Sequence, residues 1–174
     1  MKTEENLRAA FAGESEARNR YTYYAKAARK DGYHYIAKIF EETAENETQH
    51  AKDELKLLKG IGSTAENLKE AVAGEDHEAT KMYPEFAKAA EEEGNTEAAI
   101  LFRQIAKVEA EHRERYRRLL EMVEGGTVFK RDMPIRWKCS QCGYIFTGKE
   151  PPKICPSCKH PQEYYGPDCP AGCC

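Results

Sequence analysis

The chain has 174 residues, enough for one helical domain with a core and one small module but not for two full-sized domains. Charged residues make up 33% and the net charge is −3, so nothing favours nucleic acid or a membrane surface as a partner. The N-terminus lacks the apolar core of a secretory signal, and no stretch is apolar enough to span a membrane. We therefore expect a cytoplasmic protein whose seven cysteines, all after residue 138, do not form structural disulfides. Four of them stand in two Cys-x-x-Cys pairs, which favours metal binding.

Residues 1–132 predict four long helices, because their apolar runs recur at helical spacing and stop near glycines. The four ends are expected at Asp31-Gly32, Lys59-Gly60, Glu93-Gly94 and Glu124-Gly125-Gly126. Ser63 and Thr64, followed by Glu66, favour a short extra helix over residues 64–72, between the second and third long helices. We therefore expect two helical hairpins joined by a connector, which form an all-α four-helix bundle.

Residues 133–166 predict a small, loop-rich module, because seven of the eight prolines lie beyond Met133. Two Cys-x-x-Cys pairs are separated there by twelve residues, a spacing at which four thiolates can surround one ion. Zinc and iron both suit four sulfurs, and the short spacer favours iron. The predicted ligands are Cys139, Cys142, Cys155 and Cys158. Residues 167–174 form a tail with Cys169, Cys173 and Cys174, to which we assign no site.

The helical part is an internal duplication. Residues 10–14 (AFAGE) recur 61 positions later as AVAGE, and residues 25–28 (AKAA) recur 62 positions later. Each half has a Glu on its first helix and a Glu-x-x-His on its second, and residues three apart share a helix face. The six residues are Glu14, Glu47 and His50 in the first half and Glu75, Glu109 and His112 in the second.

Four carboxylates and two imidazoles suit a pair of divalent irons, and four-helix di-iron and di-manganese proteins use this set. Taken singly, each residue would be a solvated Glu or an ordinary His, but together they repeat within apolar stripes. The neighbouring Glu45 and Glu111 point away from the shared face and should lie in water.

The two halves differ at Glu78, which stands where the first half has Ala17. One turn beyond Glu75, it supplies a seventh ligand on one side, or is an ordinary exposed Glu. Tyr21 and Tyr83 can donate hydrogen bonds to ligand carboxylates, although core packing also explains them.

These segments resemble the rubrerythrins over about residues 3–166. The resemblance rests on residues 11–15 (FAGES), Gly74-Glu75-x-x-Glu78, Met82-Tyr83-Pro84, both Glu-x-x-His pairs and the two cysteine pairs, which look like rubredoxin. It implies a ferritin-like bundle with two irons and a rubredoxin-like domain with one. Lys159 departs from the pattern, because rubredoxin-like loops usually have glycine there.

The resemblance also implies roles for the ligands. Glu47 and Glu109 would bridge the two irons, Glu14 would bind one iron, and Glu75 and His112 would bind the other. His50 and Glu78 would exchange on the first iron as its oxidation state changes, and Tyr21 and Tyr83 would hydrogen-bond the ligands.

The activity implied is reduction of hydrogen peroxide to water in oxidative-stress defence. Electrons would reach the di-iron centre through the rubredoxin-like iron, from an NAD(P)H-dependent reductase or rubredoxin. A ferroxidase or iron-storage protein, an oxygen-activating di-iron enzyme and a non-enzymatic zinc protein are the alternatives.

The length of the connector between the two helix pairs bears on how many chains form the bundle. The second helix, over about residues 33–59, is about 40 Å long, whereas residues 60–74 with 64–72 helical span only about 30 Å. Four helices therefore close poorly within one chain. We expect two chains to exchange helix pairs, so that each di-iron site draws ligands from both. The resemblance implies a homodimer or higher even oligomer even without this exchange.

Overall fold

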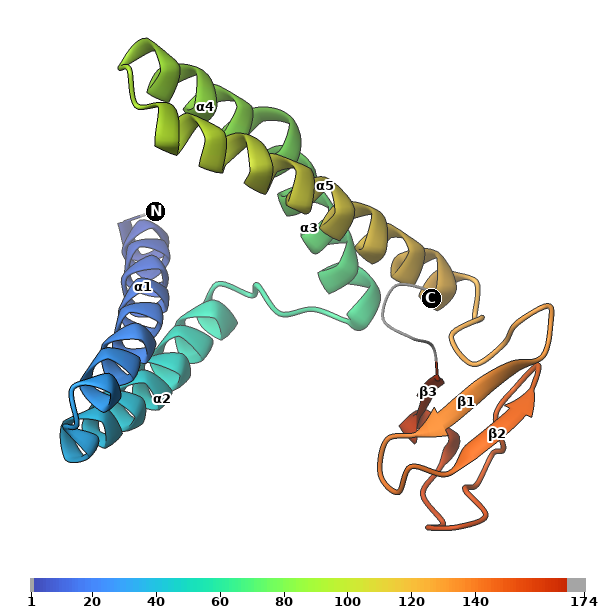
Figure 1. The fold of residues 1–174 in the computed structure, drawn as a ribbon. Helices are drawn as coiled ribbons and strands as arrows, with labels where there is room; N and C mark the ends of the chain where they lie inside the picture. The colour runs from blue at the N-terminus through green and yellow to red at the C-terminus, as the bar shows by residue number, and fades with distance from the viewer. Residues whose placement is uncertain (1, 169–174) are drawn as a thin grey trace. The chain divides into compact units, whose positions relative to one another are not determined.

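The computed structural model describes residues 2–168, so the cysteines of the tail, Cys169, Cys173 and Cys174, lie outside the described residues. It divides into two compact units, Met1–Ser63 and Thr64–Cys174 (Figure 1). Across the described range, no helix combines the length and apolarity that crossing a bilayer requires.

The first unit is a hairpin of α1 (Lys2–Lys30) and α2 (His34–Leu57). Gly32 ends α1 with a positive φ of 85°, and the backbone N–H of Tyr33 donates to the carbonyl of Ala28, which closes the turn. Buried alanines on both helices, among them Ala25, Ala37 and Ala44, let the two backbones approach closely.

The second unit begins with a long helical segment that packs against α5 (Thr96–Glu124). The segment consists of α3 (Thr64–His77), the π-helix η1 (Glu78–Met82) and α4 (Tyr83–Glu92). Asn95 caps α5, because its side chain accepts a hydrogen bond from the backbone N–H of Ala98. Buried Ala87, Ala90 and Ala99 repeat the close alanine packing of the first hairpin.

The predicted helix ends are confirmed, but the separate short helix over residues 64–72 is wrong. The third long helix begins at Thr64 and continues without a break to Glu92, so the connector after α2 is only residues 58–63. No proline precedes Pro84 in this segment, and Gly74 inside a helix costs only about 1 kcal/mol relative to alanine. The helix therefore has no reason to stop near residue 72.

An ion pair within each hairpin shows how far the duplication extends. Arg29 pairs with Glu41 across the first hairpin, and Arg103 pairs with Glu91 across the second. Arg29 corresponds to Glu91 and Glu41 corresponds to Arg103, each at a distance of 62 residues along the chain, so the basic and acidic members of the pair have changed places. The two hairpins therefore share one geometry even where their residues differ.

The cysteine module contains a three-stranded antiparallel sheet in the order β2-β1-β3. Its strands are β1 (Ile135–Cys139), β2 (Ile145–Gly148) and β3 (Tyr165–Pro167), and a short 3-10 helix (Gln162–Tyr164) precedes β3. Trp137, Cys139 and Cys155 are fully buried, and the indole N–H of Trp137 donates to the carbonyl of Gly148 at 2.9 Å. Two of the four predicted metal ligands, Cys139 and Cys155, thus form part of the core of the module.

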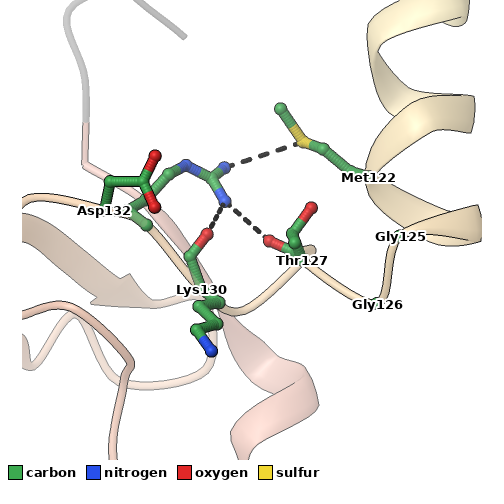
Figure 2. A pocket seen from close by; sticks show the side chains of 7 residues that line it. Met122, Gly125, Gly126, Thr127, Lys130 and Asp132 are labelled. Carbon is green, nitrogen blue, oxygen red and sulfur yellow. Dashed lines mark hydrogen bonds between the residues drawn. The ribbon is translucent and has the colours of Figure 1, made fainter.

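Arg131 joins the end of α5 to this sheet. Its guanidinium donates to the carbonyls of Thr127 and Lys130, lies 3.7 Å from the sulfur of Met122 and packs 5.3 Å from the centre of the Trp137 ring. The same segment lines an open hollow of about 510 Å³ with Met122, Gly125 and Asp132 (Figure 2). None of the predicted metal ligands lines this hollow.

Candidate metal centres

Glu14 on α1 and Glu47 and His50 on α2 form one cluster within the first unit. The Nδ1 atom of His50 lies 2.7 Å from Oε2 of Glu47 and 3.7 Å from Oε1 of Glu14. The cluster brings together one ligand from α1 and two from α2, as the Glu-x-x-His spacing predicts.

Glu75 on α3 and Glu109 and His112 on α5 form a second cluster within the second unit. The Nδ1 atom of His112 lies 2.7 Å from Oε2 of Glu109 and 3.6 Å from Oε2 of Glu75. The two clusters are therefore near-copies. The structure brings the ligands together in threes, and a centre made of all six stays a prediction.

The donor set and spacing fit a metal ion. Neighbouring ligands that each lie about 2.1 Å from one ion are about 3 Å apart, which is close to the observed 2.7 to 3.7 Å. Within the described residues, Glu45 and Glu111 are exposed and belong to neither cluster, as predicted.

The carboxylates lie in surroundings that disfavour their charge. Burial raises the pKa of Glu14, and the nearby Glu47 carboxylate raises it further. Burial and Glu109 raise the pKa of Glu75 in the same way. In the metal-free protein these like charges repel, so each cluster is arranged for a cation that neutralises them.

Glu14→Gln should raise the melting temperature of the metal-free protein at pH 7. The folded pKa of Glu14 lies above its unfolded value, so ionisation costs stability as pH rises through the folded pKa, and an amide removes that cost. The difference between variant and parent should shrink below about pH 4, where the carboxylate is protonated in both states. Thermal melts of metal-free protein across pH measure this, and Glu45→Gln is the control. A lower melting temperature for Glu14→Gln at pH 7 would contradict the repulsion.

Glu78 lies beside the second cluster, at the first residue of the π-helix, and is half-buried. The backbone N–H of Tyr83 donates to the carbonyl of Glu78, five residues back, so this turn holds one residue more than an α-helical turn. The repeat offset rises from 61 at Glu75 to 62 at Ala87, which indicates the same extra residue. The first hairpin has an unbroken α-helix at this point, so the inserted residue is a second difference between the two halves, beside Glu78 in place of Ala17.

Tyr21 and Tyr83 occupy equivalent places in the two hairpins. The Tyr21 ring lies 6.0 Å from Phe40, and the Tyr83 ring lies 6.1 Å from Phe102. Burial and the charges of Glu78, Glu109 and Glu75 raise the pKa of Tyr83, so its hydroxyl keeps its proton at neutral pH. Packing of both rings is thus established, while hydrogen bonds to the ligands stay a prediction.

The structure adds Glu54, which sequence reasoning missed. Its Oε2 atom is buried and has no hydrogen-bond partner among the described residues, and its charge contributes to the raised pKa of Glu14. Glu54 lies two helical turns beyond Glu47, on the same face of α2. That spacing was a usable signal, but the counterpart of Glu54 in the second half is Tyr116, so the repeat comparison passes over it.

The four predicted cysteines meet in one cluster. The Sγ atoms of Cys139 and Cys158, and those of Cys142 and Cys155, are 3.7 Å apart. A tetrahedron with metal–sulfur bonds of about 2.3 Å has edges of about 3.8 Å, so the cluster already has the size of a four-thiolate site.

The thiols differ in how readily they ionise. Burial opposes ionisation of Cys155, but hydrogen bonds, including one from the backbone N–H of Cys158, outweigh it and lower its pKa to about 6. The backbone N–H of His160 favours the thiolate of Cys158, yet burial and the other cysteines outweigh it and raise its pKa to about 12. Four thiolates therefore need a bound cation to coexist.

Each cysteine pair is followed directly by a residue with a left-handed backbone conformation. Gly143 has a φ of 77° and Lys159 a φ of 63°, and their backbone N–H groups donate to the carbonyls of Cys139 and Cys155. The left-handed backbone at Lys159 costs on the order of 1–2 kcal/mol for a residue with a side chain. Lys159 thus has the same left-handed backbone and hydrogen bond as Gly143 in the other loop.

Comparison with known proteins gives consistent matches. The rubrerythrin family model matches residues 5–120, and the model of the rubrerythrin rubredoxin-like domain matches residues 137–166. A rubrerythrin of Porphyromonas gingivalis is 54% identical, over 95% of this chain and 90% of its own. A putative rubrerythrin of Methanocaldococcus jannaschii is 48% identical, over 96% and 93%. A solved structure titled as a mixed-valence state of nigerythrin is 36% identical, over 95% and 86%, with a TM-score of 0.37.

Proposed function

The chain belongs to the rubrerythrin family, and on that premise we propose that it reduces hydrogen peroxide to water with electrons delivered through its own cysteine module. Membership gives a ferritin-like domain with a di-iron carboxylate site and a rubredoxin-like domain with one iron, which support an iron-dependent peroxidase role. The proposal rests on the presence of both kinds of metal-ligand set in one chain: two clusters of Glu and His residues and one cluster of four cysteines.

The electron count explains why both sites are needed. Reduction of one peroxide consumes two electrons and two protons and yields two waters. When bound, two ferrous ions supply both electrons together, whereas a four-sulfur iron passes one at a time. The cysteine module therefore acts as the supply. Family members receive electrons from rubredoxin-type partners, and we propose an NAD(P)H-dependent reductase, directly or through rubredoxin, as the source here.

We propose that all six Glu and His residues, with Glu78, hold the two irons in one centre. In that centre Glu47 and Glu109 would bridge, Glu14 would bind one iron, and Glu75 and His112 would bind the other. His50 and Glu78 would exchange on the first iron, and Tyr21 and Tyr83 would donate hydrogen bonds to the ligands. The half-buried position of Glu78, close to Glu75 and Tyr83, supports a place for it among the ligands of the centre.

Replacing Glu78 with alanine should leave iron binding nearly unchanged but slow peroxide turnover roughly 10- to 100-fold. The six remaining ligands still bind two irons, whereas the exchange loses one of its two partners. Iron analysis and steady-state peroxide consumption measure the two effects. Glu85→Ala, on the exposed first turn of α4, is the control. Full turnover in Glu78→Ala would contradict the exchange.

We propose that the six-ligand centre forms between two copies of the chain. Ferritin-like bundles contain a long crossover. The connector here is residues 58–63, which reach at most about 24 Å, whereas α2 is about 36 Å long. One chain therefore cannot make the crossover, and two chains that exchange hairpins make a homodimer that avoids it.

Exposed apolar residues support this pairing. Ile36, Ile39 and Leu57 lie at helical spacing on the face of α2 that carries His50, and they are 44% to 70% exposed. Leu101, Val108 and Leu119 lie likewise on the face of α5 that carries His112, at 43% to 55%. Each hairpin thus presents an apolar stripe around its histidine, which pairing with the other kind of hairpin would bury.

An anaerobic rapid-mixing experiment tests the function. The chemically reduced protein is mixed with hydrogen peroxide or with dioxygen, and the colour of the oxidised irons is followed. We expect each molecule of peroxide to oxidise two ferrous ions. We also expect oxidation by peroxide to be much faster than oxidation by dioxygen. Faster oxidation by dioxygen, with accumulation of a ferric mineral, would identify a ferroxidase instead.

We also propose that the protein works in a reducing, cytoplasmic setting, because the ligand thiols must stay reduced.

A further inference from the structure

Lys159 is the feature of the cysteine module that ligand binding does not explain. Among the described residues other than glycine, only Lys59 and Lys159 have a positive φ. Lys59 lies just after the end of α2, whereas Lys159 directly follows the ligand Cys158. The equivalent position in the other cysteine pair is Gly143, where the same backbone carries no strain. A strained residue beside a functional site suggests that its side chain is used.

The side chain of Lys159 folds back along the loop that holds the metal. Its ammonium donates a hydrogen bond of 2.9 Å to the carbonyl of Pro156, which lies between the ligands Cys155 and Cys158. The positive charge is thereby held over the segment Cys155–Cys158 instead of extending away from it. Within the described part of the module, the other loop has the uncharged residues Gln141 and Gly143 around its second cysteine.

From this geometry we propose that Lys159 raises the reduction potential of the four-cysteine iron. Reduction adds one electron and one negative charge to the iron–thiolate cluster, and no bond forms or breaks. An ammonium held on the Cys155–Cys158 loop by its hydrogen bond to Pro156 stabilises the more negative, reduced form. Lys159 is exposed and the ligand before it, Cys158, is half-buried, whereas Cys139 and Cys155 are fully buried, so the ammonium lies at the solvent-facing part of the site.

The consequence deepens the proposed function. A higher potential lets the module take an electron from weaker donors and keep it until a peroxide arrives. The inference rests on the proposed electron supply only for this use, because the potential itself can be measured whether or not the protein reduces peroxide.

The test separates charge from backbone strain with three variants of the iron-loaded, full-length protein. Lys159→Gln removes the charge and keeps the strain, Lys159→Arg keeps both, and Lys159→Gly removes both. Redox titration with mediators, followed by the colour of the four-cysteine iron, measures the potential. Lys149→Gln, which makes the same charge change elsewhere on the module, is the control.

In Lys159→Gln and Lys159→Gly the equilibrium constant for reduction should fall about three- to tenfold, tenfold being 59 mV for one electron. Lys159→Arg and Lys149→Gln should stay near the parent, and high salt should shrink the differences. Only Lys159→Gly should also gain stability. An unchanged potential in Lys159→Gln, or a change in Lys159→Gly alone, would overturn the inference. If these shifts occur while peroxide is not reduced, the proposed reaction fails and the inference about Lys159 stands.

Discussion

Replacing Cys158 with serine should lower peroxide turnover supported by NAD(P)H roughly 100-fold or more, because the substitution would break the proposed one-electron route to the di-iron centre. Cys158 lies 3.7 Å from Cys139 in the thiolate cluster, and the loss of one ligand leaves the tetrahedral site incomplete. The Glu/His clusters use no residue of the module, so the protein should still bind two irons per chain.

Two measurements make this result specific. The iron content should fall from three to two ions per chain. The rate at which peroxide oxidises chemically reduced Cys158→Ser in a single turnover should match that of the parent. Cys169→Ser, a cysteine to which no site is assigned, should behave as the parent in every assay. NAD(P)H-supported turnover that survives in Cys158→Ser would show that electrons bypass the module.

Mixing two inactive variants should restore about a quarter of the parent's peroxide turnover if the hairpins are exchanged between chains. One variant, Glu47→Ala with His50→Ala, has a damaged first cluster, and the other, Glu109→Ala with His112→Ala, has a damaged second cluster. In an exchanged heterodimer, one centre receives both damaged clusters and the other receives two intact ones. Random pairing makes about half of the dimers mixed, so about a quarter of all centres are intact.

The two variants must be unfolded together, refolded and loaded with iron so that hairpins can exchange partners. Each variant refolded alone is the control and should have almost no activity. Circular dichroism should show the parent's helix content in both, because the substitutions remove ligands and leave the alanine packing in place. If every centre forms within one chain, each centre contains a damaged cluster, and the mixture stays inactive.

The features that the sequence predicts well are those with a strong local cause. The helices end within two residues of the predicted places, before left-handed glycines in three cases and before left-handed Lys59 in the case of α2. The Glu-x-x-His spacing brings each histidine to 2.7 Å from its glutamate. The cysteine pairs meet because their spacing closes a small tetrahedral site. In each of these cases a few neighbouring residues decide the geometry.

The features that the sequence obscures depend on competition between weak local signals. Ser63 and Thr64 resemble the start of a short helix, but nothing ends that helix near residue 72, so it continues to Glu92. The change of repeat offset from 61 to 62 marks the inserted residue without showing that a π-helix absorbs it. Glu54 becomes visible only once burial leaves its carboxylate oxygen without a partner.

The central claim is that the two three-ligand clusters combine into one centre with two irons. X-ray absorption at the iron edge, measured on Cys158→Ser so that the four-sulfur iron is absent, tests it most directly. We predict oxygen and nitrogen ligands and a second iron about 3.5–4 Å from the first. Two irons per chain with no iron neighbour within that distance would show two separate mononuclear sites and would contradict the claim.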